Sequence, residues 1–279
     1  MTTTGNAPRF TGAVAIVTGS GSVGDGQSVG FAIARALATQ GASTVIVDRS
    51  PETAQNTADR LIGEGISAEK ILVAEAGVAS DEDCARVVDL AKARFGAINV
   101  LVNNVGVTGP AGTAVDVDVD GWTSALAINV TSMMLMAKHA VPAMVHDGTA
   151  SIVNISSGAG LRGGHPSLLY PTSKGAVVNM TRAMAVHHGQ MGVRVNCVAP
   201  GLIHTPMVAR RGMSVEQRLA RAGHTLLGTE GTAADVADAV AFLASREARW
   251  ITGVVLPVDG GENAGDAHLP VPPSDGRST

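Results

Sequence analysis

Short apolar runs alternate with amphipathic segments along most of the chain. The run AVAIVTG at 13–19 has the length of a strand and ends in glycine, and the segment at 31–42 repeats its apolar residues at helical spacing before another glycine. This alternation predicts seven strands, over residues 13–19, 43–48, 71–77, 98–104, 150–156, 193–201 and 253–261. It predicts six main helices, over residues 31–42, 51–65, 81–96, 122–145, 169–190 and 233–245.

The predicted strands are apolar along their whole length rather than at every second residue. Such strands are buried on both faces, as in a parallel sheet covered by helices on both sides. The sequence therefore predicts an α/β fold with a doubly wound, seven-stranded parallel sheet. No linker interrupts the pattern, so residues 12–261 are expected to form a single domain after a polar lead at 1–11. The Pro- and Gly-rich tail at 262–279 predicts either a disordered extension or an arm that packs on another subunit.

Composition excludes several classes of protein. The 279 residues are 45% hydrophobic, which excludes a disordered chain, and the formal net charge of −4 gives no basic footprint for nucleic acid. The two cysteines, Cys84 and Cys197, do not make a disulfide framework, and no histidine lies in a metal-ligand motif. No signal peptide and no apolar run of membrane-spanning length is visible, so we expect no membrane partner, no metal and a reducing, cytoplasmic location.

A glycine-rich turn follows the first predicted strand and opens the first predicted helix. It reads VTGSGSVGDGQSVGFAIA from residue 17 and contains five glycines. Glycines let the backbone approach a pyrophosphate, and the helix N-terminus supplies N–H donors for it. A flexible surface loop has the same composition, but the position between strand and helix favours a dinucleotide site.

Asp48 closes the second predicted strand, 29 residues after Gly19. A carboxylate there accepts both hydrogen bonds from an adenosine ribose and repels a 2′-phosphate, which favours NAD over NADP. The neighbouring Arg49 favours NADP instead, because an arginine pairs with a 2′-phosphate. The alternative for Asp48 is an acid that only caps a helix or lies in a loop.

Tyr170 and Lys174 stand four residues apart in the sequence YPTSK, which on a helix puts both on one face. A nearby cation favours tyrosinate, so the phenol can exchange a proton with an alcohol or a carbonyl. Ser157, at the end of a predicted strand, offers a hydroxyl to the oxygen of a carbonyl substrate. Asn129 lies among apolar residues inside a predicted helix, where asparagine is unfavourable. The alternatives are a surface Tyr–Lys pair and an asparagine that only satisfies a backbone carbonyl.

These features occur with several other motifs in one order along the chain. In that order and spacing the chain resembles the short-chain dehydrogenase/reductase family, from about Phe10 to Gly261. The motifs are VTG…SVG at 17–30, Asp48, NNVG at 103–106, Asn129, NISS at 154–157, YPTSK at 170–174, NCVAPGLIHT at 196–205 and ITGVVLPVDGG at 251–261. The resemblance implies a Rossmann sheet of strand order 3-2-1-4-5-6-7 and hydride transfer at a nicotinamide.

The family's catalytic tetrad maps onto Asn129, Ser157, Tyr170 and Lys174. The resemblance implies that Tyr170 is the acid/base and that Ser157 positions the substrate oxygen. It also implies that Lys174 binds the nicotinamide ribose and lowers the pKa of Tyr170, and that Asn129 holds a water in the proton relay. The family's cofactor contacts map onto Gly19, Ser28, Val29, Gly30, Asp48, Arg49, Val78, Asn104, Gly106, Tyr170, Lys174, Pro200, Gly201, Ile203 and Thr205.

The chain departs from the family pattern at two places in the nucleotide site. Five extra residues enlarge the glycine-rich turn, and Ser28 occupies the place of the middle glycine. Gly77 stands where the family often has an aspartate that contacts adenine. We expect Val78 to keep its apolar contact, while the polar contact is missing or comes from another group. Neither change touches the predicted chemistry.

Residues 206–227 fall where the family places its mobile substrate lid. Arg210 and Arg211 within this segment either grip an anionic substrate or are solvated charges. His165 and His204 flank the expected cleft, which makes them candidates for contact with the substrate.

The family also implies a homotetramer. Its two-fold interfaces correspond to the helices predicted at 122–145 and 169–190, and to the segment 233–258. Two isologous contacts of this kind generate D2 symmetry. The apolar content of 122–145 exceeds what one stripe against the sheet needs. The residues that cover more than one side are Met133, Met134, Met136, Ala137 and Val141.

The leading hypothesis is therefore an oxidoreductase that transfers a hydride between NAD(H) and a small secondary alcohol or ketone. The first alternative is a 3-oxoacyl-thioester (acyl-carrier-protein) reductase using NADPH, against which Asp48 speaks. The second is a non-catalytic nucleotide-binding sensor on the same fold, which has no need of a complete tetrad. The lid and the loop after Gly106 are expected to set the shape of the substrate pocket.

Overall fold

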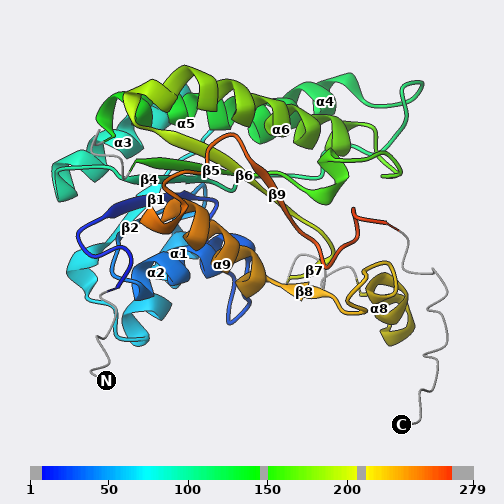
Figure 1. The fold of residues 1–279 in the computed structure, drawn as a ribbon, viewed down its shortest axis with the longest axis horizontal. Coiled ribbons are helices and arrows are strands. Elements are labelled where there is room, and N and C mark those ends of the chain that lie inside the picture. The colour runs from blue at the N-terminus through cyan, green and yellow to red at the C-terminus, as the bar shows by residue number, and fades with distance from the viewer. Residues whose placement is uncertain (1–7, 145–149, 206–211, 266–279) are drawn as a thin grey trace, which may run out of the picture.

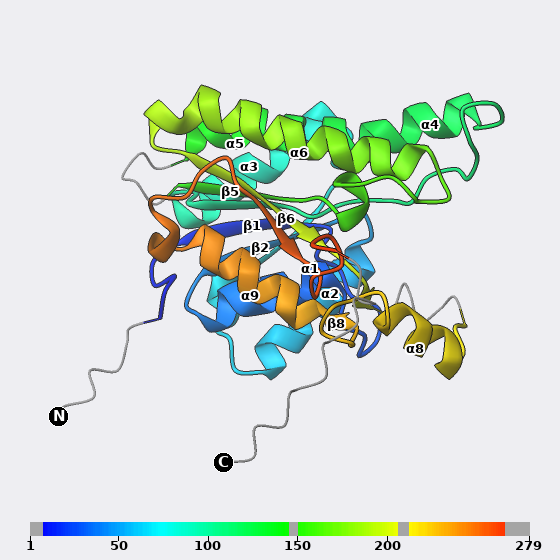
Figure 2. The same ribbon diagram turned by 45° about the vertical axis from the view of Figure 1, so that its right-hand side comes forward.

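A computed structural model describes residues 8–144, 150–205 and 212–265 of the chain. A layer of strands lies between two layers of helices (Figure 1, Figure 2). The strands of the main sheet are β1 (Val14–Thr18), β2 (Ser43–Asp48), β3 (Ile71–Glu75), β4 (Val100–Asn103), β5 (Ser151–Ile155), β6 (Arg194–Pro200) and β9 (Val255–Val258). A second, short sheet pairs β7 (Ile203–His204) with β8 (Gly231–Thr232). The α-helices are α1 (Val29–Thr39), α2 (Pro51–Gly63), α3 (Asp81–Phe95), α4 (Val119–Leu126), α5 (Ser132–Ala140), α6 (Leu169–His188), α8 (Val215–Ala222) and α9 (Ala233–Ala244).

The main sheet is parallel throughout and has the strand order β3-β2-β1-β4-β5-β6-β9. Successive residues of a strand point to opposite faces, so each strand contributes to two cores. Val17 and Val102 pack with α1, α2 and α9, whereas Ile16 and Leu101 pack with α3, α5 and the end of α6. The predicted doubly wound Rossmann fold and its strand order are therefore confirmed.

The strand order reverses at β1, which pairs with β2 on one side and with β4 on the other. In open α/β sheets, ligands bind in the crevice outside the carboxyl ends of the strands at this point. Asn104 links the two sides of the crevice, because its Nδ2 donates to the carbonyl oxygens of Thr18 (3.2 Å) and Gly19 (2.9 Å). The loop after β4 is thereby fastened to the turn after β1.

The long helix predicted at 122–145 is divided in the structure. It consists of α4, a π-helical turn at Ala127–Thr131 and α5, followed by a 3-10 turn at Val141–Ala143, while residue 145 lies outside the described residues. Asn129 lies in the π-helical turn, a kind of irregularity that is frequent at functional sites. Apolar spacing over a single turn does not distinguish an α-helix from a π-helix, so the sequence did not indicate this feature.

The predicted lid contains elements that the apolar pattern did not indicate. The helix α8 begins with a capping box formed by Ser214 and Gln217, and none of its residues is buried. The predicted last strand at 253–261 is shorter in the structure, where it ends at Val258 and a turn follows. Residues 206–211 of the lid, with Arg210 and Arg211, lie outside the described residues.

Two further expectations concern the chain as a whole. None of the helices among the described residues is long and apolar enough to cross a membrane. In the same residues, no group of three histidine, cysteine or acidic side chains is placed to hold a metal ion. Residues 1–7 of the lead and 266–279 of the tail lie outside the described part, so the contact of the tail with a second subunit stays a prediction.

Candidate active site

The turn after β1 lies against the start of α1 with no room for side chains between them. Gly19 has a φ of +62°, in the left-handed region that favours glycine. A methyl group on Gly30 would lie 2.0 Å from the Gly19 carbonyl oxygen, so the two segments approach this closely only because residue 30 is glycine. Ser28 caps the helix, since its Oγ accepts a hydrogen bond from Phe31 N (3.0 Å) and donates one to the Gly21 carbonyl (3.2 Å).

The start of α1 is thereby suited to an anion. The helix begins at Val29, two residues before the start predicted from the sequence. The first N–H groups of a helix have no partner within it, and the helix dipole favours negative charge there. The turn, packed this closely on the start of α1, lies beside these N–H groups, and this arrangement suits the diphosphate of a nicotinamide dinucleotide.

Asp48 lies beside this turn at the carboxyl end of β2. Its Oδ2 accepts a hydrogen bond from the backbone N–H of Gly21 (3.0 Å), and its Oδ1 accepts one from Ser50 (3.2 Å). The carboxylate is half-buried and the neighbouring Arg49 is exposed. A methyl group on Gly21 would lie 2.6 Å from Oδ2, so this approach also requires glycine. The structure therefore brings together the turn and the carboxylate that the sequence predicts to hold the cofactor.

A second carboxylate lies near the position where the family often has its adenine-contacting aspartate. The backbone N–H of Gly77 donates to Oδ2 of Asp83 (2.9 Å), which lies in the first turn of α3. Hydrogen bonds from Arg86 and from Gly77 lower the pKa of Asp83. Val78 is buried in the core with Cys84 and Val87, and its contact with adenine stays a prediction. The sequence analysis did not single out Asp83, because an acid in the first turn of a helix is ordinary.

Tyr170 and Lys174 occupy the first two turns of α6, as their spacing predicts. Lys174 is buried, and its ammonium donates to the carbonyl oxygen of Ile155 at the end of β5 (3.0 Å). Burial disfavours the charged form and lowers the pKa of Lys174 to about 8. A methyl group on Gly106 would lie 3.0 Å from Nζ, so the loop after β4 passes close to the amine.

Ser157 follows β5 in an extended conformation and is half-buried. Its Oγ accepts a hydrogen bond from the backbone N–H of Ala159 (3.2 Å), which leaves the hydroxyl hydrogen for another acceptor. Its neighbour Ser156, which the sequence analysis did not single out, donates to the carbonyl of Lys174 (2.7 Å). This bond brings the strand end that carries Ser157 next to the helix that carries Tyr170.

Asn129 is buried and uses its side chain to join two elements. Its Oδ1 accepts from the backbone N–H of Val107 (2.8 Å), and its Nδ2 donates to the Val107 carbonyl (2.9 Å) and to Ser173 Oγ (3.0 Å). The side chain therefore fastens the loop after β4 to α6. This matches the alternative in which the asparagine satisfies backbone groups, and the water-holding role stays a prediction.

His165 packs against the ring of Tyr170. Their ring centroids are 5.1 Å apart with an angle of 35° between the planes. Nδ1 of His165 lies 3.1 Å from the backbone nitrogen of Ser167, a contact that orients the imidazole. The structure thus places His165 beside the predicted acid/base, and its contact with the substrate stays a prediction.

The remaining predicted cofactor contacts follow β6. Pro200 ends this strand, and a methyl group on Gly201 would lie 2.5 Å from Cβ of Asp259 in the turn after β9. Ile203 is buried in β7. Thr205 is the last described residue before residues 206–211.

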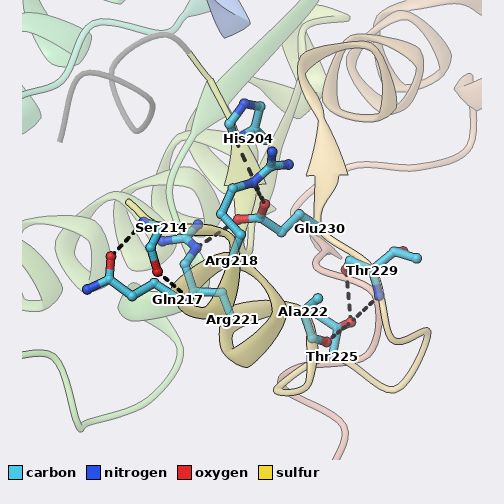
Figure 3. Close-up of polar contacts among 9 residues, drawn as sticks. All are labelled: His204, Ser214, Gln217, Arg218, Arg221, Ala222, Thr225, Thr229 and Glu230. Carbon is cyan, nitrogen blue, oxygen red and sulfur yellow. Dashed lines mark hydrogen bonds and ion pairs between the residues drawn. The ribbon is translucent and has the colours of Figure 1, made fainter. Parts of the chain in front are cut away.

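Glu230 anchors the lid helix α8 (Figure 3). Its side chain is only 6% exposed, and its two oxygens accept from Nε of Arg218 (2.9 Å) and Nε of Arg221 (2.8 Å). Burial acts to raise the pKa of Glu230, but the hydrogen bonds from the two arginines outweigh it and hold the pKa below its usual value. Nδ1 of His204 lies 3.8 Å from the same carboxylate, so the lid helix is joined to β7 through this cluster.

Comparisons with known proteins show which family the chain is similar to. The sequence model of a family described as Enoyl-(Acyl carrier protein) reductase matches residues 23–263. A cis-4-hydroxycyclohexanecarboxylate dehydrogenase of Sinomonas cyclohexanicum is 38% identical over 255 residues, which are 91% of this chain and 98% of that protein. A 2-(R)-hydroxypropyl-CoM dehydrogenase of Xanthobacter autotrophicus is 39% identical over 256 residues, with 90% and 98% covered. The solved structure of a short-chain type dehydrogenase/reductase from Mycobacterium ulcerans has a TM-score of 0.84 and 32% identity, covering 92% of each chain.

The chain belongs to the short-chain dehydrogenase/reductase family. It is therefore an oxidoreductase of a family that works with a nicotinamide cofactor. The match to the solved structure also confirms the Rossmann fold implied by the sequence motifs. The roles of the four tetrad residues in this short-chain dehydrogenase/reductase stay predictions, although the structure places Ser157 directly after β5 and bonds Lys174 to the end of the same strand.

The burial of Lys174 predicts how the stability of this short-chain dehydrogenase/reductase depends on pH. The pKa of Lys174 is about 8 in the folded chain and 10.5 ordinarily, so between these values the unfolded chain binds more protons than the folded chain. The contribution of this group to the free energy of unfolding therefore rises with pH over that window. Urea unfolding at several pH values should show the wild type gaining stability relative to Lys174→Met. A difference that is constant with pH would mean that the amine keeps its ordinary pKa.

Proposed function

We propose that this chain is an NAD-dependent dehydrogenase that interconverts a secondary alcohol and the corresponding ketone. The observation that carries the proposal is the placement of Tyr170 and buried Lys174 at the start of α6, which Ser156 ties to the strand end carrying Ser157. The two relatives described above are named dehydrogenases of hydroxy compounds, and both names describe a secondary alcohol.

In this function Tyr170 moves a proton at the substrate oxygen. Its hydroxyl group, as tyrosinate, takes the proton from the alcohol during oxidation and returns it to the ketone oxygen during reduction. The Ser157 hydroxyl donates a hydrogen bond to the same oxygen and orients it. The Lys174 ammonium favours the tyrosinate, since a cation near a phenol stabilises its ionised form. The nicotinamide, when bound, supplies or accepts the hydride.

The proposed cofactor is NAD. The Asp48 carboxylate is held by two backbone N–H groups beside the glycine-rich turn, which puts negative charge where a 2′-phosphate would have to lie. The exposed Arg49 makes NADP the less favoured alternative. The other residues proposed to line the cofactor are Gly19, Ser28, Val29, Gly30, Val78, Asn104, Gly106, Tyr170, Lys174, Pro200, Gly201, Ile203 and Thr205.

The alternatives are less well supported. The names of the two relatives favour oxidation of an alcohol over reduction of a 3-oxoacyl thioester with NADPH. A nucleotide-binding sensor without activity has no need of a buried lysine beside a tyrosine. The cytoplasm remains our expected location, in keeping with Cys84 and Cys197, which are both buried free thiols.

We propose that the protein is a homotetramer. The exposed residues that support this proposal differ from the apolar residues named in the sequence analysis. Of the five apolar residues cited within 122–145, only Met134 is exposed, because α5 and the 3-10 turn after it pack against α3, α6 and the sheet and bury the rest within the chain. Exposed apolar side chains lie instead at Val186 in α6 and at Trp250 shortly before β9. Trp250 is 95% exposed, and so large an apolar side chain on a surface is typical of an interface.

Replacement of Tyr170 by phenylalanine tests the proton transfer. Tyr170→Phe removes the transferable proton and keeps the ring, so kcat should fall by at least about 100-fold while the Kd for NADH changes little. The assay follows nicotinamide absorbance with a panel of secondary alcohols.

Tyr170 is the only tyrosine of the chain, so tyrosinate absorbance reports the ionisation of this group alone. Lys174→Met should move the ionisation of Tyr170 to higher pH, because the variant lacks the cation that stabilises tyrosinate. A Phe variant with near-normal turnover would remove Tyr170 from the mechanism.

The cofactor preference is tested by comparing kcat/KM for NAD and NADP. The wild type should prefer NAD, and Asp48→Ala should narrow the difference, because the variant loses both the ribose bonds and the repulsion of the 2′-phosphate. Arg49→Ala is the matched control and should leave the preference for NAD in place or increase it. A wild-type preference for NADP would show that Arg49 dominates the site.

The assembly is tested by light scattering, which should report a mass near four times 28.1 kDa. Trp250→Ser removes an exposed apolar side chain, so it should shift the mass towards a smaller species while the chain stays folded. Leu90→Ser, at another exposed apolar position on α3, is the control and should leave the mass unchanged. An active wild-type monomer at micromolar concentration would contradict the proposed tetramer.

A further inference from the structure

One face of α2 holds the enlarged glycine-rich turn by its carbonyl groups. Three polar residues of this helix, the neighbours Asn56 and Thr57 and, one turn later, Arg60, all donate to turn residues that are more than 30 positions earlier in the chain. These bonds go to the part of the turn that the extra residues enlarge. We call these three residues the α2 clamp.

Arg60 makes the most extensive contacts of the α2 clamp. Its Nη1 donates to the carbonyl oxygens of Gly26 (2.9 Å) and Gly24 (3.2 Å), and its Nη2 donates to that of Asp25 (3.4 Å). Its guanidinium carbon lies 3.7 Å from the ring centroid of Phe31, a buried residue of α1, at a distance typical of a cation–π contact. No carboxylate among the described residues forms an ion pair with Arg60 at salt-bridge distance. The guanidinium of Arg60 therefore interacts with these carbonyl oxygens and with the Phe31 ring.

Asn56 and Thr57 hold the first half of the turn. Nδ2 of Asn56 donates to the Ser22 carbonyl (3.0 Å), to Ser22 Oγ (3.1 Å) and to the Gly24 carbonyl (3.1 Å). Oγ1 of Thr57 donates to the Ser20 carbonyl (2.8 Å). The α2 clamp therefore binds the turn at five residues, Ser20, Ser22, Gly24, Asp25 and Gly26, and restrains its backbone along most of its length.

The bound carbonyl groups also set the direction of the backbone N–H groups. In a trans peptide the C=O and the following N–H point in opposite directions, and the described residues contain no cis peptide. With the Gly24 and Gly26 carbonyls bound to Arg60, the N–H groups of Asp25 and Gln27 point away from α2. Neither N–H has a hydrogen-bond partner in the described part of the chain, so both are free for a ligand.

We propose that Arg60 is a positioning residue for the dinucleotide, because it holds the enlarged turn in the shape that receives the diphosphate. A glycine-rich segment of this length loses much conformational entropy when it becomes ordered. Without the α2 clamp, the turn would become ordered only when the dinucleotide binds, so binding would carry the entropy cost. The apparent affinity for the dinucleotide would then be the intrinsic affinity multiplied by the fraction of molecules whose turn has the competent shape. The inference rests on the proposed function, since it takes the turn to be the dinucleotide site.

The experiment is fluorescence titration of the full chain with NADH, together with KM and kcat for NAD and for the best alcohol of the substrate panel. Arg60→Ala should raise the Kd for NADH about tenfold, the effect of reducing the competent fraction to about a tenth. The KM for the alcohol and kcat at saturating NAD should stay within about twofold. Arg60→Lys keeps the charge without the planar fork and should recover part of the affinity. This separation of cofactor binding from turnover is not expected of a general loss of stability.

Two further variants keep the test decisive. Arg35→Ala removes an arginine of α1 that pairs with Glu64 and forms no hydrogen bond or ion pair with the turn in the described part of the chain, so its Kd should match the wild type. If Arg60→Ala does not fold, Asn56→Ala takes its place, and a raised Kd supports the proposal. The proposal is overturned if the Kd for NADH is unchanged in Arg60→Ala, or in Asn56→Ala when Arg60→Ala does not fold. A wild-type chain that binds NADH but oxidises no alcohol overturns the proposed reaction alone, whereas a chain that binds no dinucleotide overturns both proposals.

Discussion

Lys174 carries an ammonium group into the interior of the protein, and much of the site is arranged around that group. A buried charge is tolerated only where hydrogen bonds replace the lost water. The Ile155 carbonyl supplies one such bond at the end of β5, and Ser156 binds the backbone of Lys174 itself. A methyl group on Gly160 would lie 2.6 Å from the Lys174 carbonyl carbon, so α6 approaches residue 160 this closely only because that residue is glycine. The place of Tyr170 on the same helix follows from this packing.

The segments around the crevice are held differently from the core. The sheet and its helices are joined by apolar contacts, whereas the glycine-rich turn is held by carbonyl hydrogen bonds from α2 and the lid helix by the arginines on Glu230. These hydrogen bonds and ion pairs orient the turn and the lid helix without burying them in the core. They keep the turn and the lid accessible to ligands, and the ion pairs of the lid are open to screening by salt because the arginines are partly exposed.

The turn after β9 lies beside the loop that follows Ser157, since a methyl group on Gly158 would lie 2.8 Å from Nδ2 of Asn263. Asp259 accepts from the backbone N–H groups of Gly261 (2.9 Å) and Asn263 (3.0 Å), and Glu262 pairs with Arg162 in the loop after Ser157. The chain that follows β9 is therefore part of the same group of loops as the proposed catalytic serine. This places the beginning of the tail beside the candidate active site of its own chain.

The sequence by itself determined the order and type of the main elements, because uniformly apolar strands and amphipathic helices leave strong patterns. It also brought Tyr170 and Lys174 onto one helix face, since that relation depends only on helical spacing. The tertiary structure decided what depends on distant partners. The roles of Ser156, Arg60 and Glu230 arise from contacts between elements, and no local pattern marks a serine or an arginine that binds a remote carbonyl. The π-helical turn at Asn129 and the two-residue strands β7 and β8 were likewise decided by packing, because elements so short carry no periodicity of their own.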